Sequence, residues 1–146
     1  MGQQQLLLVI LVTIIVGIAT VVALNTFSSA AEAAMIDAVR LDLLSAGGAA
    51  QGYYMRPVML GGGGRTYANV DFRRFAFPGR IVEGSDNLES ENENATYVIS
   101  GQSQNEFLIT GTISGSLVSL SARVCPNGLK MGKPGIGVPP APDACN

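Results

Sequence analysis

The chain opens with an unbroken run of apolar residues. Positions 6–24 are apolar apart from Thr13, Gly17 and Thr20, and the first charged residue of the chain is Glu32. As a helix rising 1.5 Å per residue, this run would extend roughly 28 Å, close to the ~30 Å thickness of a bilayer's hydrocarbon core. A single segment can satisfy its backbone in lipid only as a helix. We therefore predict a membrane-spanning helix.

A cleaved secretory signal is the alternative interpretation of this run, with cleavage near Ala30. Such signals carry a basic N-terminal region and an apolar stretch of about 7–15 residues. The chain instead begins Met1-Gly2 followed by Gln3, Gln4 and Gln5, without a basic residue, and its apolar run is longer. These features favour retention of the segment.

The helical pattern continues beyond the apolar run. One face at a spacing of three and four residues comprises Ile36, Val39, Leu43, Ala46 and Ala50. The roughly opposite face comprises Phe27, Ala34, Ala38, Leu41 and Ser45. Asp37 and Asp42 lie on the flanks between the two faces. We predict one helix from about residue 3 to residue 50–54, roughly 70–80 Å long, which must protrude from a small domain. Glycines and Pro57 end it.

From Thr96 onward the pattern changes to the alternation typical of strands. The apolar positions of three expected strands are Tyr97 and Ile99; Phe107, Ile109 and Ile113; and Val118, Leu120, Ala122 and Val124. Short polar turns between them predict an antiparallel meander with one buried face. The Ile36/Val39/Leu43 face of the helix is the expected cover, which assigns the chain to the α+β class. Phe75 and Phe77, in a possible short strand at 71–77, are expected core anchors.

Two cysteines bound a C-terminal segment rich in proline and glycine. Cys125 and Cys145 are the only cysteines of the chain, and the loop between them has little apolar content of its own. A disulfide closing a loop of this size contributes about 3 kcal/mol in the chain-entropy description. Two free buried thiols are the alternative. We predict the disulfide, which would place this part of the chain outside the cytoplasm.

Composition excludes several classes of function. The chain has no His, so the commonest general base and metal ligand are missing, and we expect neither an enzyme nor a cofactor or metal site. A net charge of −2 argues against a nucleic-acid partner, because phosphate binding requires a basic patch. The acidic stretch at 86–94 does not match a calcium loop and is expected to be solvated. The glycines at 61–64 lack the Lys of a phosphate loop and predict a surface connector.

The layout as a whole resembles that of type IV pilins and pilin-like filament subunits. A short polar N-terminus, an apolar helix that continues into an amphipathic half, a small antiparallel sheet and a loop bounded by two cysteines together carry the resemblance, over the whole chain. The sequence departs from the usual pattern in three respects. The proline that usually breaks the helix near the end of the apolar stretch is absent, which leaves Gly17 as the only weak point. The chain also lacks a basic leader, and Gln3, Gln4 and Gln5 stand where such pilins have a glutamate near the mature N-terminus. The resemblance therefore implies a divergent member.

The resemblance implies a structural subunit of an extracellular helical filament at the cell surface. Such a subunit first resides in the inner membrane as a single-pass precursor, and its partners are copies of itself, the membrane before assembly and the pilus assembly machinery. Residues 1–30 would form the membrane and filament-core half of the helix, and residues 31–146 the globular head. The expected polymerisation residues are Leu6, Leu7, Leu8, Val9, Ile10, Leu11, Val12, Ile14, Ile15, Val16, Gly17, Ile18, Val21, Val22, Leu24, Phe27, Ala34, Ala38 and Leu41.

Physical argument leads to the same function. The apolar run cannot remain in water once it leaves the bilayer, so it must enter a bundle of identical segments. The glutamine triplet would cap the terminal amine in that dry bundle without adding a charge. The alternative is that the triplet simply lies in the headgroup region before assembly. Asn94-Ala95-Thr96 has the spacing of a glycosylation sequon, so glycans are a possible modification. The competing interpretation is a monomeric membrane-anchored pseudopilin or a bitopic extracytoplasmic binding domain.

Overall fold

The computed structural model describes Gly2–Asn146, with one long helix followed by a small sheet. The elements in chain order are α1 (Gly2–Met55), the 3-10 turn η1 (Val58–Leu60), β1 (Arg80–Ile81), β2 (Glu89–Glu91), β3 (Ala95–Ser100), β4 (Phe107–Ile113), β5 (Val118–Cys125), β6 (Gly128–Met131) and β7 (Gly135–Ile136). The chain divides into two units, Met1–Ala34 and Met35–Asn146. The second unit is called the head below.

Helix α1 confirms the long N-terminal helix expected from the hydrophobic pattern. It passes without a break through Gly17 and through the glycines near its C-terminal end, and it ends just before Pro57. Gly47 has a packing role there, because a Cβ at this position would collide with the side chain of Leu129. The helix therefore approaches β6 closely at a point where the sequence indicated only weak helix propensity.

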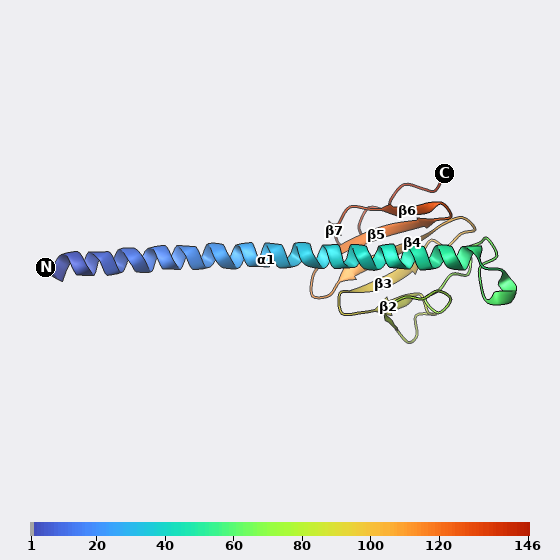
Figure 1. Ribbon diagram of the computed structural model, residues 1–146, viewed down its shortest axis with the longest axis horizontal. Helices are drawn as coiled ribbons and strands as arrows, with labels where there is room; N and C mark the ends of the chain where they lie inside the picture. Colours follow the sequence, from blue (N-terminus) through green and yellow to red (C-terminus); the bar gives the residue numbers. More distant parts are fainter. Residues whose placement is uncertain (1) are drawn as a thin grey trace. The chain divides into compact units, whose positions relative to one another are not determined.

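The head contains an antiparallel sheet in the order β1-β2-β3-β4-β5-β6, with β7 pairing with the first residues of β5. The three predicted strands correspond to β3, β4 and β5, and their register places Ile99 opposite Ile109 and Ile109 opposite Ala122. Figure 1 shows the C-terminal part of α1 lying along the sheet, with β2 and β6 to either side. The α+β architecture is confirmed, with four short strands added to the predicted meander.

The core lies between the predicted inner face of the helix and the sheet. Val39, Leu43, Ala46 and Ala50 are buried with the inward residues of β3, β4 and β5. Phe75 is buried and Phe77 packs against the same cluster, as expected. The possible strand at 71–77 is wrong, because Asp71 accepts hydrogen bonds from the backbone amides of Arg73 and Arg74 and thereby stabilises a turn.

The four glycines at 61–64 are not the plain surface connector that the sequence indicated. Gly62 and Gly63 are buried, and a Cβ on Gly62 would collide with the carbonyl of Arg56. The amides of Gly63 and Gly64 donate to the carbonyls of Tyr53 and Arg56 at 2.8 and 3.0 Å. The segment thus wraps the end of α1 and satisfies carbonyls that would otherwise lack a partner.

Candidate interaction surface

The N-terminal unit presents an apolar surface on every side of its helix. All residues from 2 to 30 are exposed, and the large apolar side chains between Leu6 and Leu24 range from 48% exposed at Val12 to 69% at Leu7. Within Gly2–Asn146, α1 is the one helix long and apolar enough to cross a membrane. A helix that is apolar all round requires lipid or other protein around it.

Threonine side chains adapt this helix to a non-aqueous environment. The hydroxyl groups of Thr13, Thr20 and Thr26 donate to the carbonyls of Ile10, Val16 and Val22 at 2.8–2.9 Å. Each hydroxyl thereby satisfies its donor within the helix, so it carries no unpaired donor into an apolar medium. The helix carries no acidic or basic side chain before Glu32, so its surface is suited to packing against lipid or other helices.

In the head, the outer side of α1 also carries exposed apolar side chains. Leu41 is 67% exposed, as the predicted second face requires, whereas Ala38 is half-buried. Met35 and Leu44, which the sequence reasoning did not include, are exposed as well. In the N-terminal unit, the predicted residues Phe27 and Ala34 are also exposed. Met35 and Leu44 lie beside this predicted face at helical spacing, so a prediction with a wider apolar stripe would have included them.

Asp42 fixes α1 to the sheet through one carboxylate oxygen. Its Oδ2 accepts hydrogen bonds from Tyr97 Oη at 2.6 Å and from the side-chain amides of Asn92 and Asn94, each at 2.9 Å. The three donors come from β3 and the turn before it, about 50 residues further along the chain. Charge-assisted hydrogen bonds of this kind are stronger than neutral ones.

These contacts keep Asp42 ionised. Burial of the carboxyl raises its pKa, but the three hydrogen bonds together outweigh burial and hold the pKa below the ordinary 3.8. Burial, followed by the hydrogen bond to Asp42, raises the pKa of the Tyr97 hydroxyl well above its usual range, so the hydroxyl remains a donor. Asp42 therefore stabilises the fold at neutral pH and loses this contribution as the pH falls through its lowered pKa.

Replacing Asp42 with Ala is expected to lower the free energy of unfolding by about 1.5–3 kcal/mol at pH 7, because three donors lose a charged acceptor. The difference from wild type should narrow as the pH falls below the ordinary value of 3.8. Urea unfolding at pH 7 and at low pH measures both. Asp37→Ala is the control, since the Asp37 carboxylate is exposed and pairs only with Arg40 in the next turn. A difference for Asp42→Ala that is independent of pH would contradict this role.

The C-terminal segment is held on the outer face of β5 by side chains as well as by the predicted disulfide. Cys125 and Cys145 are bonded, with their Cα atoms 5.7 Å apart. Alternate residues of β5 donate to carbonyls of the proline-rich segment: Ser119 to Gly137, Ser121 to Pro140 and Arg123 to Pro142. Proline has no N–H, so at its prolines this segment cannot donate the backbone hydrogen bonds of a regular strand pair. Its carbonyls can still accept hydrogen bonds from the side chains of β5.

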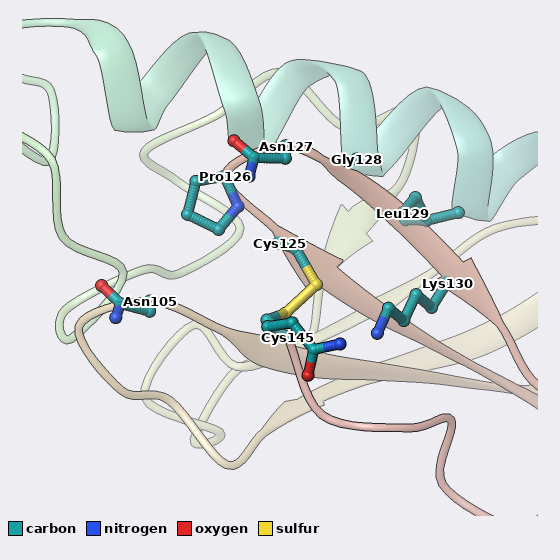
Figure 2. Close-up of a pocket in the computed structure, with 9 residues that line it drawn as sticks. Asn105, Cys125, Pro126, Asn127, Gly128, Leu129, Lys130 and Cys145 are labelled. Atoms are coloured by element: carbon teal, nitrogen blue, oxygen red, sulfur yellow. A yellow bond between two sulfur atoms is a disulfide. The ribbon is translucent and has the colours of Figure 1, made fainter.

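A cavity of about 520 Å³ lies beside the disulfide (Figure 2). Its lining comprises Asn105, Cys125, Pro126, Asn127, Gly128, Leu129, Lys130, Cys145 and Asn146. The Lys130 ammonium group donates to the carbonyl of Ala144 at 2.6 Å, and Glu106 binds Arg123 and the amide of Cys145 just behind the bridge. The lining residues present amides and an already bonded ammonium group, which suits structural support rather than proton transfer.

The remaining predicted sites lie apart from one another. Gln3, Gln4 and Gln5 are exposed on the first turns of α1, and Met1 lies outside the described residues. The acidic stretch at 86–94 contains β2 rather than a plain loop, and no group of three metal-ligating residues occurs within Gly2–Asn146. The sequon residue Asn94 donates its side-chain amide to Asp42, so a glycan on that nitrogen would displace one of the bonds to Asp42.

No protein-family model, curated protein or solved structure matches this chain. The features that bear on function are therefore those of the chain itself. They are an apolar N-terminal helix of the kind that anchors in a membrane or serves as a signal, and a disulfide that indicates an oxidising environment.

Proposed function

We propose that this protein is a structural subunit of an extracellular pilus-like filament, which polymerises through its N-terminal helix after residing in the inner membrane. One observation carries the proposal, the exposure of fourteen large apolar residues between Leu6 and Leu24. Burying half of them stabilises an assembly by roughly 10–20 kcal/mol, at about 1.5–3 kcal/mol each. In the bilayer lipid covers this surface, and outside the bilayer identical helices cover it.

The apolar surface of the N-terminal helix suits packing in a helical filament. Heterologous contacts that repeat without closing generate a helical polymer. The small residues Gly17, Ala19 and Ala23 allow close approach of neighbouring helices. Leu41 and Leu44 then provide a second apolar contact between the heads. Gln3, Gln4 and Gln5 cap the terminal amine in the bundle, which keeps its centre free of acidic groups.

The partners follow from this function. Copies of the same chain form the polymer, the membrane holds the precursor, and a pilus assembly machinery extracts it. The disulfide supports placing the head outside the cytoplasm, and the absence of acidic or basic residues before Glu32 supports a dry filament core.

Electron microscopy of material sheared from the surface of cells that produce the full chain tests the proposal. Thin fibres labelled by an antibody to the head are expected. Leu41→Glu should abolish them while the folded precursor persists in membranes, because a charge is costly only where Leu41 becomes buried. Ala76→Glu, at an exposed position of the head outside α1, is the matched control and should leave fibres intact.

One outcome would contradict the filament, and a second would contradict the contact between heads through Leu41. The first is the absence of labelled fibres together with a stable membrane pool of wild-type protein, which would favour the monomeric anchored pseudopilin or bitopic binding domain. The second is normal fibre formation by Leu41→Glu, which would remove the outer side of α1 from the assembly.

A further inference from the structure

The head carries exposed apolar side chains at two places that the N-terminal helix does not explain. The first, called the tip, is the segment at 55–60, which comprises the last residue of α1 and the turn after it and in which Met55, Val58, Met59 and Leu60 are 69–97% exposed. The second, called the base, comprises Leu117, Ile136 and Val138, which are 76–95% exposed. Side chains this apolar at this exposure indicate interaction sites when they cluster.

The pairing of β5 with β7 brings the base residues to one end of the sheet. Val118 lies opposite Ile136, and the amide of Gly137 donates to the carbonyl of Leu117 at 2.9 Å. Leu117 and Ile136 therefore lie at adjoining positions of the backbone at one end of the sheet, where alternation points their side chains to opposite faces, and Val138 follows two residues after Ile136. The tip is compact as well, because η1 folds Val58, Met59 and Leu60 into a single turn.

The tip and the base lie at opposite ends of the head. The base adjoins the turn between β4 and β5, at the end of the sheet near Val39, which contacts Gly111 of β4. The tip begins where α1 ends, 16 residues beyond Val39, or roughly 24 Å further along the helix axis. Figure 1 shows the green turn after α1 at one end of the head and β7 at the other.

The tip and the base of the head differ in the sign of their charged residues. Between Leu43 and Val70 the only charged residues are Arg56 and Arg65, so the tip is basic. At the base, Glu93 is exposed and precedes Asn94, whose carbonyl accepts from the amide of Ser114 in the β4–β5 turn. Lys133 is set back from this end, because it follows Gly132, whose amide donates to the carbonyl of Ser121 in the middle of β5. Arg80 lies beside Glu93 but pairs with Glu91, so Glu93 remains as the carboxylate that can meet the two arginines of a second copy's tip.

We propose that the tip of one copy docks on the base of a second copy, joining heads end to end. The two surfaces differ, so the contact is heterologous and repeats along a line of subunits. A basic tip would repel another tip, whereas it attracts the carboxylate at the base. The inference rests on the proposed filament function for the alignment of successive copies, and it adds to that function a joint between heads that does not involve the apolar helix.

Cross-linking of the full chain on cells tests the joint. Both native cysteines are in the disulfide, so Met59→Cys and Val138→Cys introduce the only free thiols. With a short bis-maleimide, a chain carrying both substitutions should give a ladder of covalent multimers. Each single variant should remain monomeric. The pair Met59→Cys and Ala76→Cys is the matched control, with one thiol away from the base, and should give no ladder.

Charge reversal provides the second measurement. In the doubly substituted chain, Arg56→Glu should reduce the yield of cross-linked dimer by about two- to fivefold, the size expected of an exposed ion pair. Adding Glu93→Arg should restore the yield. Restoration by a second reversal is not expected from misfolding, so it separates a direct contact from damage to the head.

The outcomes distinguish the joint from the filament. Labelled fibres without a ladder would overturn the joint and leave the filament standing, and a ladder without fibres would do the reverse. A dimer from Met59→Cys alone would show tip-to-tip contact and overturn the heterologous joint. Protection of Met59→Cys from a membrane-impermeant maleimide, without any ladder, would assign the tip to a lipid surface and overturn the joint as well.

Discussion

Replacing Leu43 with Ala is expected to lower the free energy of unfolding of the head by about 2–5 kcal/mol. Leu43 is fully buried in the cluster that joins α1 to the sheet, so truncation removes its transfer free energy and leaves a cavity between two elements that cannot close completely. A domain of this size has a total stability of about 5–15 kcal/mol. One substitution would therefore remove a large share of it.

Leu41→Ala is the matched control, since Leu41 is the same residue type two positions away on the same helix but 67% exposed. It should change the unfolding free energy by about 0.5 kcal/mol or less. Near-ultraviolet circular dichroism during urea unfolding of the detergent-solubilised chain reports the head alone, because all four tyrosines lie between Tyr53 and Tyr97. Equal losses for the two variants would contradict the assignment of one face to the core and the other to contacts outside the head.

This pair also shows how much of the fold could be predicted from sequence. A period of 3.6 residues separates the two faces of α1, so the spacing alone assigns Val39 and Leu43 to one side and Leu41 to the other. Alternation of apolar residues identified β3, β4 and β5 for the same reason. Such patterns need several repeats, and these elements are long enough to provide them.

The remaining strands could not be predicted because they are too short for a pattern. Strands β1 and β7 have two residues each, β2 has three, and β6 has four half-buried residues without alternation. The role of Gly62 was equally hidden, since a run of glycines indicates freedom and not the close contact with the Arg56 carbonyl that requires it.

The candidate interaction surface could also be predicted from the sequence only in part. Its apolar residues between 6 and 24 could be predicted from the hydrophobic pattern, because a helix that is apolar on every side requires lipid or other protein around it. The contacts of Asp42 do not, because the pattern placed this residue on a flank of the helix without indicating partners about 50 residues away. Long-range polar contacts depend on register, which the hydrophobic pattern sets only coarsely.

Replacing both Cys125 and Cys145 with Ser is expected to lower the unfolding free energy by about 3 kcal/mol, the value for closing a loop of this length in the unfolded chain. The bridge spans a sequence separation of 20 residues. The double variant leaves no free thiol to form new bridges. Wild-type protein treated with reductant should show the same loss, which controls for the serine hydroxyls.

The residues at which hydrogen exchange accelerates show what holds the C-terminal segment, residues 132–146, against β5. Hydrogen exchange should accelerate most in residues 132–146, while amides in β3 and β4 change only with global stability. Some protection should persist at Gly132 and Gly137, because their amides bond to the carbonyls of Ser121 and Leu117 independently of the bridge. Uniform acceleration across the head would contradict this division. It would mean that the bridge acts only through global stability. Complete loss of protection at Gly132 and Gly137 would instead mean that the bridge, and not the side chains of Ser119, Ser121 and Arg123, holds the segment against the sheet.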